Sequence, residues 1–259
     1  MMIREVKNGV TYYRSTLLSC PHAFSTRHGG VSTKAHLATM NLGQGRGDEE
    51  ENLAENYRRF LAAADLPARL VSASQIHSDT VLTVDSVPAE APSLDGFVTK
   101  VKGLTLAVKI ADCLPILLED AEAGVVGAVH AGWRGSVKGI TLRALEQMVA
   151  LGARRENIRA VIGPRIGPCC FEVRDDFVTE YLSYLGDFGK QFLHTRGEKI
   201  FCDLPALNRE LLLSGGVLPA HFEDSGLCTC CDPETFFSHR ALRGVRGTMA
   251  AMISLGAKA

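Results

Sequence analysis

The stretch 104–139 constrains the fold more than any other part of the chain, because it joins buried strands to chemically reactive side chains. Its two apolar runs, 104–110 and 125–129, are rich in Val, Ile and Leu, a composition that predicts strands buried on both faces. Cys113 lies just beyond the first run, and His130 directly follows the second. Sites tend to form beyond strand ends, so we expect the thiol and the imidazole to meet at one edge of a sheet.

After His130, the residues Ala131-Gly132-Trp133-Arg134-Gly135 predict a turn that opens into an amphipathic helix. Apolar residues then recur at helical spacing from Val137 until Gly152, which ends the stripe. The backbone N–H groups at a helix N-terminus are free and partially positive, so such a turn favours an anion. The sequence therefore predicts a metal site beside an anion site.

The length and composition predict one domain that binds a small molecule. A chain of 259 residues with 46% hydrophobic content can build a large core, and no repeat or Pro/Ser-rich linker divides it, so we expect a single domain over 1–259. Helical and strand patterns alternate irregularly, which favours a mixed α/β fold with mixed sheets. The net charge of -1 provides no long-range attraction to nucleic acid or to a membrane surface. The sequence carries no signal for an oligomeric state.

The N-terminal residues lack the apolar run of about seven residues that a signal peptide needs, and no run approaches the roughly 18 that span a membrane. A cytoplasmic protein is therefore expected. The eight cysteines could suggest disulfides, but disulfide frameworks are typical of short secreted chains. We interpret the cysteines as reduced thiols.

The periodicity of apolar residues predicts further elements along the chain. Helices are expected over 48–65, around 177–185 and from a capping Asp203 to about residue 213. Two strands are expected on either side of a break near His77, with further short strands at 158–162 and 249–253.

The other cysteines form patterns that are weaker than a metal motif. Cys228 and Cys231 form a C-x-x-C, but no second such pair exists to complete a structural zinc site. Cys169 and Cys170 are adjacent, and neighbouring cysteines seldom bind one ion together. We interpret all four as small buried hydrophobic residues.

His77, Cys113 and His130 are a different kind of candidate. A catalytic zinc takes three N or S ligands and keeps a fourth position open, so two imidazoles and one thiolate satisfy it. Their separations of 36 and 17 positions are common in unrelated proteins, and a lone His is often only a structural residue. From residue types alone, a metal site and a structural role both remain open.

Nine motifs occur in an order that resembles a known family. They are FSTRHGGVS (24–32), MNLG (40–43), S-x-x-Q-x-H-S (72–78), DG (95–96), ADCLP (111–115), HAGWRG (130–135), IGP (162–164), CCFEV (169–173) and FFSHR (236–240). Together they resemble the multicopper polyphenol oxidase, or laccase-like, family, also known as the purine nucleoside phosphorylase family of peptidoglycan editing factors. The resemblance runs from about Phe24 to the C-terminus.

This resemblance implies a four-layer α-β-β-α domain with zinc held by His77, Cys113 and His130. The implied reaction is the phosphorolysis of adenosine, inosine and methylthioadenosine to the base and ribose 1-phosphate, with adenosine deamination as a second activity. The implied partners are therefore a nucleoside and phosphate. Bacterial members are also linked to the removal of wrongly built peptidoglycan precursors.

The motifs also suggest roles for individual residues. Cys113, His77 and His130 are the expected catalytic group, and Asp112 is a candidate for orienting a ligand or moving a proton, with turn capping as the alternative. The candidates for binding substrate or phosphate lie in four different segments: Asn41, Arg58, Gln75 and Arg134.

The chain departs from the family pattern in two places. The family usually has Arg after Asn56, where a basic residue serves the phosphate, but here Tyr57 follows, so that Arg58 or Arg59 substitutes or the contact is lost. The usual Gly-Arg before the last strand appears in an altered form, Gly244-Val245-Arg246-Gly247.

Three alternatives accompany the zinc-dependent nucleoside enzyme. A multicopper oxidase needs many imidazoles, typically in His-x-His pairs, and the eight histidines include no such pair, although the single site could hold copper. A hydrolase could use Cys113 as nucleophile and His130 as base, as in an amidase acting on a cell-wall precursor. A non-catalytic metal-binding module is the third, and it fits less well because structural zinc seldom leaves a position open.

Overall fold

The computed structural model describes residues 1–256, and the last three residues of the predicted domain, 257–259, lie outside this range. In the described range the strands form two six-stranded sheets and one three-stranded sheet. The first sheet contains, in spatial order, β1 (Met2–Lys7), β2 (Val10–Ser15), β3 (His22–Ser25), β15 (Met249–Ser254), β7 (Leu104–Ile110) and β4 (Arg69–Val71). The second contains β14 (Phe222–Asp224), β10 (Arg159–Ile162), β8 (Leu114–Asp120), β9 (Val125–Ala131), β6 (Gly96–Thr99) and β5 (Val81–Thr83).

Both large sheets combine antiparallel and parallel pairs, so the predicted mixed α/β fold with mixed sheets is confirmed. In the first sheet only β4 and β7 are parallel. In the second, the two edge strands β14 and β5 are each parallel to their neighbour.

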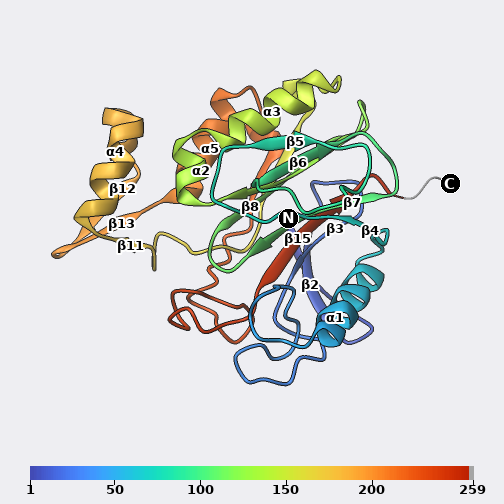
Figure 1. The fold of residues 1–259 in the computed structure, drawn as a ribbon. Helices are drawn as coiled ribbons and strands as arrows, with labels where there is room; N and C mark the ends of the chain where they lie inside the picture. The colour runs from blue at the N-terminus through green and yellow to red at the C-terminus, as the bar shows by residue number, and fades with distance from the viewer. Residues whose placement is uncertain (257–259) are drawn as a thin grey trace.

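The two sheets pack face to face with helices on both outer surfaces (Figure 1). Side chains such as Phe24 and Leu106 of the first sheet meet Phe97 and Leu117 of the second in a shared core. Helix α1 (Glu50–Ala63) buries its apolar stripe, including Phe60, against the first sheet. Helices α3 (Ile140–Ala150) and α5 (Leu204–Ser214) cover the second sheet. The four layers α-β-β-α that the resemblance implied are therefore present.

The two apolar runs in the centre of the chain form β7 and β9, which belong to different sheets. The chain leaves the first sheet after Ile110 and enters the second at Leu114, where a strand that was not predicted, β8, begins. Cys113 therefore meets His130 at one end of the second sheet, as expected, but β8 rather than β7 positions the thiol.

The helix predicted after His130 is divided in two, α2 (Trp133–Val137) and α3. Gly139 lies between them with φ of 84°, a conformation that glycine adopts far more readily than other residues. The apolar spacing continues across the break, which is why periodicity alone predicted one stripe.

The remaining elements form an extension beside the second sheet (Figure 1). Its strands and helix are β11 (Glu172–Val173), β13 (Lys199–Cys202), β12 (Leu193–Arg196) and α4 (Asp175–Lys190). Two short 3-10 helices, Arg155–Asn157 and Pro219–His221, lie outside the extension and precede β10 and β14. Asp203 caps α5 as predicted, because its side chain accepts a hydrogen bond of 3.0 Å from the N–H of Ala206. Over residues 1–256, none of the helices has the length and apolar character needed to cross a membrane.

Candidate active site

The strand pairing of β8 and β9 brings Cys113 and His130 together. In this antiparallel pair Pro115 lies opposite His130, so the residues just before β8 and at the end of β9 share one end of the second sheet. His77 joins them from the loop between β4 and β5. One ligand atom from each of the three side chains lies within 4.8 Å of the others, and we call this group the ligand triad.

Asp95, which immediately precedes β6, positions the loop that carries His77. Its carboxylate accepts hydrogen bonds from the backbone N–H groups of Ile76, His77 and Ser78, at 3.2, 3.1 and 2.6 Å. Within this loop His77 itself has φ of 59°, in the left-handed region that few residues other than glycine adopt. The three hydrogen bonds offset the strain of that backbone and direct the imidazole toward the cavity.

The same carboxylate orients His130. Nδ1 of His130 lies 2.8 Å from Oδ1 of Asp95, which leaves Nε2 as the free ring nitrogen. The register of the sheet causes this contact: Gly96 pairs with Val129, so the preceding Asp95 lies beside His130. In the sequence, Asp95 stands out only as part of the DG motif. Its role depends on which strands pair, and a single sequence does not show that.

The electrostatics at His130 favour a positive charge. Burial lowers the pKa of His130, but Cys113 and then the Asp95 carboxylate raise it by more, so that the net effect is a pKa of about 9. Burial raises the pKa of Asp95, but the hydrogen bonds from His130 and Ser78 bring it down to about 2. Partial burial, and then the neighbouring His130, lowers the pKa of His77 and favours its neutral form, which binds metals.

The ligand triad fits a single zinc ion. Two imidazoles and one thiolate are the donors that zinc takes in sites with an open fourth position, and a carboxylate behind one histidine is the usual support for such a ligand. The side chain of Asp95 is fully buried, so its orientation of His130 is held by the core. In the described part of the chain no further histidine joins the triad, and the geometry therefore does not fit a multicopper cluster.

Close backbone approach is required at Gly132, which begins the turn before α2. A Cβ atom at this position would lie 2.5 Å from Nδ1 of His77 and 3.4 Å from Cε1 of His130. The first glycine of the HAGWRG motif therefore makes room for the ligand triad.

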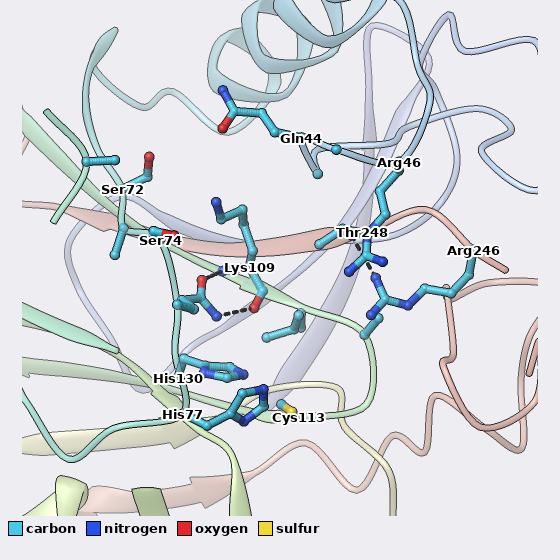
Figure 2. A pocket seen from close by; sticks show the side chains of 17 residues that line it. Gln44, Arg46, Ser72, Ser74, His77, Lys109, Cys113, His130, Arg246 and Thr248 are labelled. Atoms are coloured by element: carbon cyan, nitrogen blue, oxygen red, sulfur yellow. Dashed lines mark hydrogen bonds between the residues drawn. The ribbon is translucent and has the colours of Figure 1, made fainter. Parts of the chain in front are cut away.

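A cavity of about 420 Å³ opens above the triad, within the range of about 300–1,000 Å³ that small-molecule sites occupy. Arg46, Lys109 and Arg246 line it, and we call it the cationic cavity (Figure 2). Figure 2 shows Arg46 and Arg246 approaching from two different loops, with His77, Cys113 and His130 below them. Burial, and then repulsion from Arg46, lowers the pKa of Arg246 to about 10, and burial lowers that of Lys109.

A second cavity of about 390 Å³ adjoins the triad and shares His77, Cys113, Arg46 and Arg246 with the first. Trp133 and Phe171 supply aromatic surface to its wall, and Ile166 adds aliphatic surface, so we call it the aromatic cavity. The ligand triad therefore borders both cavities. Arg46 and Arg246 line both of them, Lys109 lines only the first, and the aromatic rings line only the second.

Asp112, the predicted orienting or proton-transfer residue, uses both carboxylate oxygens to hold neighbouring loops. Oδ1 accepts a hydrogen bond of 2.6 Å from the hydroxyl of Thr229, and Oδ2 accepts one of 2.6 Å from the backbone N–H of Arg240. Its φ of 87° is unusual for a residue with a side chain. These contacts match the turn-capping alternative. Asp112 also lines the aromatic cavity, and its role in orienting a ligand or moving a proton stays a prediction.

The predicted substrate-binding residues are placed mostly away from the cavities. Asn41 is fully buried, where its side chain bonds to Gly43, to Asp48 and to the N–H of Thr248. Gln75 lines the cationic cavity, but its amide is bonded in both directions to the backbone of Lys109.

The two predicted arginines are directed toward glutamates. Arg58 pairs with Glu55 on the exposed face of α1, and Arg134 pairs with Glu180 at 3.1 Å. Within residues 1–256, neither arginine is among those that line the two cavities. Tyr57, which replaces the expected Arg, donates a hydrogen bond of 2.8 Å to the carbonyl of Leu42.

Three cationic residues were missed as site residues. Lys109 belongs to an apolar strand and was counted only as part of that strand. Arg46 lies in a glycine-rich loop without a motif, and Arg246 belongs to the altered Gly-Arg segment. The altered segment was the one available signal, because the family places a basic residue near it.

Fold and site together define a protein with three potential metal ligands beside small-molecule cavities. The family described as multi-copper polyphenol oxidoreductase laccase matches residues 21–256. The chain is 41% identical over 254 residues to a purine nucleoside phosphorylase of Deinococcus radiodurans, covering 95% of this chain and 94% of the relative. It is 34% identical over 235 residues to a protein named adenosine deaminase RL5 from an unknown prokaryotic organism, covering 85% and 88%.

The fold comparison agrees with the sequence comparison. The crystal structure of YlmD from Geobacillus stearothermophilus matches with a TM-score of 0.86 at 32% identity, covering 97% of this chain and 98% of that one. The chain therefore belongs to this family of enzymes, as the motif resemblance predicted.

Proposed function

We propose that the chain is a zinc-dependent purine nucleoside phosphorylase with adenosine deaminase as a second activity. The observation that carries this proposal is that the ligand triad borders two adjoining cavities, one with Lys109 and the other with aromatic rings, and that Arg46 and Arg246 line both. Adenosine, inosine and methylthioadenosine each combine an aromatic base with a ribose that phosphate attacks at C1′. A base in one cavity and phosphate in the other would meet beside the triad.

The cationic cavity supplies the positive charge that phosphate requires. Arg46 and Arg246 repel one another, and an anion between them relieves that repulsion. Lys109 adds a third cation from β7. Because the pKa of Arg246 is about 10, its guanidinium remains protonated at neutral pH. Holding phosphate in a fixed position against C1′ lowers the activation free energy, because the two reactants no longer have to lose their freedom of motion when they react.

The aromatic cavity suits a purine. Trp133 packs on Phe177 with ring centroids 4.6 Å apart, so its indole has a supported orientation. Phe171 contributes a second ring to the wall of the cavity. Stacking against such rings binds purines without distinguishing strongly among them, which fits several nucleosides as substrates.

His77, Cys113 and His130 would hold the zinc, which supplies a Lewis acid with one open position. Asp95 keeps His130 in the tautomer whose Nε2 faces the site. Deamination is a different step, in which water adds at C6 of the base and the amino group leaves as ammonia; zinc, when bound, would lower the pKa of that water. The cytoplasmic location and the editing of peptidoglycan precursors that the resemblance implies belong to the same proposal.

The test is a product assay with the purified full-length chain. With adenosine and phosphate we expect adenine and ribose 1-phosphate, together with some inosine, and phosphorolysis should stop when phosphate is omitted. A His77→Ala variant should lose both activities. Wild-type product levels no higher than those of this variant would refute the proposal.

The same preparation separates the alternatives. A Cys113–His130 hydrolase is favoured by the contact between the two side chains, and it would hydrolyse amide substrates in metal-free form and lose activity on alkylation. A copper-dependent polyphenol oxidoreductase would instead oxidise phenols after copper loading. Either result without nucleoside turnover would replace the proposed function.

A further inference from the structure

Two loops that are far apart in the sequence run side by side next to the aromatic cavity. One follows β10 and the other follows β14, and these strands are parallel neighbours with Ala160 opposite Phe222. Beyond the strands the pairing continues: the N–H of Arg165 donates to the carbonyl of Leu227, and the N–H of Thr229 donates to the carbonyl of Arg165. The register of the two strands therefore determines which residues of the loops face each other.

This register gathers four thiols, which we call the cysteine cluster: Cys169, Cys170, Cys228 and Cys231. Their sulfur atoms all lie within 4.8 Å of one another. Sγ of Cys231 is 3.4 Å from Sγ of Cys169 and 3.4 Å from Sγ of Cys170. A tetrahedron of sulfurs around zinc, with Zn–S bonds of about 2.3 Å, has edges of about 3.8 Å. The thiols are therefore spaced as the ligands of one ion.

The backbone at Gly167 accommodates the sulfur atoms of two of these cysteines. The N–H of Gly167 donates to Sγ of Cys228 at 3.2 Å, a contact that stabilises negative charge on the sulfur. A Cβ atom on Gly167 would lie 3.2 Å from Sγ of Cys169 and 3.6 Å from Sγ of Cys228. The glycine thus leaves room for two thiols at once.

The interpretation of these residues as small buried hydrophobic side chains is wrong. Cys169 and Cys231 are exposed, and the other two are half-buried. Adjacent cysteines seldom bind one ion together, yet the sulfurs of both Cys169 and Cys170 lie 3.4 Å from that of Cys231. The second pair that a zinc site requires is supplied by the other loop, 58 or more positions along the chain.

We propose that the cysteine cluster binds a structural zinc ion that is separate from the ligand triad and clamps the two loops together. Four thiolates fill all positions of a tetrahedral ion, so this site has no place for substrate. The ion would stabilise the loops that supply Thr229 to Asp112 and Ile166 to the aromatic cavity. The guanidinium of Arg240 also donates hydrogen bonds of 3.0 Å to the carbonyls of Cys170 and Glu172, so it holds the backbone next to two of the thiols.

Metal analysis of the full-length chain, purified in the presence of a phosphine reductant, tests this site without reference to the reaction. We expect two zinc ions per wild-type chain and one in a His77→Ala variant. A Cys169→Ser, Cys231→Ser double variant should also retain one, and a variant that combines all three substitutions should retain none. Cys230→Ser is the matched control, since Cys230 lies between two cluster ligands but outside the set, and it should keep both ions.

Cobalt supplies a readout that needs no substitution in the cluster. Metal-free His77→Ala protein titrated with Co²⁺ should show intense thiolate-to-cobalt charge transfer and the strong visible bands of a tetrahedral four-thiolate site. The double variant should also unfold at a lower temperature than the Cys230→Ser control. One zinc in the wild type that His77→Ala alone removes, or intact-mass evidence that the four cysteines form disulfides in the reduced preparation, would overturn the proposal.

Discussion

The ligand triad and the cysteine cluster contain the same kind of metal-binding chemistry on very different scaffolds. Two members of the triad lie at the ends of β8 and β9, and the third is held by hydrogen bonds to the buried Asp95. The cluster lies entirely in loops, with two of its thiols exposed to solvent. The triad offers three ligands beside two cavities, whereas the cluster offers four and encloses its ion.

This difference separates a site suited to chemistry from a site suited to stability. An open position must be kept open by a rigid frame, because a flexible frame would supply a fourth ligand of its own. Packed strand ends and a fully buried carboxylate provide that rigidity. A closed four-thiolate site does not need a rigid scaffold, since the bound metal itself orders the loops that bind it.

The largest difference between the two sites is expected from Asp95→Asn. The buried carboxylate accepts hydrogen bonds from three backbone N–H groups, from the Ser78 hydroxyl and from His130. An amide in its place turns an NH₂ group toward some of these donors and removes the negative charge. We expect zinc affinity at the triad to fall about 10- to 100-fold, as for other carboxylates that support a metal-binding histidine.

Competition with a chelating dye measures this affinity, and the cysteine cluster serves as an internal reference whose affinity should not change. Ser78→Ala is the matched control, because it removes one hydrogen bond to the same carboxylate and keeps the charge. Equal losses at both metal sites, or an unchanged triad, would show that Asp95 does not distinguish the two scaffolds.

Much of the triad was predictable because its members combine suggestive residue types with recognisable motifs. The apolar runs also identified β7 and β9, and the four layers followed from the resemblance. Asp95 was not predictable in its role, since its contact with His130 comes from the pairing of β6 with β9. The cysteine cluster was misinterpreted for the same reason: the parallel pairing of β10 and β14 creates it, and local sequence does not encode that pairing.

The phosphate-binding residues illustrate another limit. Arg58 and Arg134 have the right charge, but each forms a salt bridge with a nearby glutamate on the surface. Lys109, on a strand that is otherwise buried, reaches the cavity because a β-strand alternates its side chains between faces. Charged residues can be counted in a sequence, but whether their side chains point into a cavity or toward a neighbouring ion is known only from the fold.

A smaller effect is expected from placing a methyl group beside each metal site. In Gly132→Ala the new Cβ would lie 2.5 Å from Nδ1 of His77, so the imidazole must move or the turn must shift. Overpacking of this kind costs about 1–3 kcal/mol, and we expect weaker zinc binding at the triad together with slower turnover.

Gly167→Ala is the paired change at the cysteine cluster. Its Cβ would lie 3.2 Å from the thiol of Cys169, so a shift of a few tenths of an ångström relieves the contact. Thermal unfolding and zinc stoichiometry should show a larger defect for Gly132→Ala, confined to the triad. A larger defect for Gly167→Ala would indicate that the loops are the more rigid of the two scaffolds.

The smallest effect is expected from Arg134→Ala, although this arginine belongs to the HAGWRG motif next to the triad. Its ion pair with Glu180 is exposed on both sides, and its guanidinium stacks 4.2 Å above the Trp133 ring. Exposed ion pairs contribute about 0–1 kcal/mol, so stability should change by less than about 1 kcal/mol and the KM for phosphate should hardly change. Arg246→Ala is the contrasting variant, because a hydrogen bond to a charged group contributes about 1.5–3 kcal/mol and its loss should raise the KM for phosphate tenfold or more. If Arg134→Ala has the larger effect on KM, phosphate binds at the turn before α2 and not in the cationic cavity, and the proposed arrangement of the two substrates around the triad must be reversed.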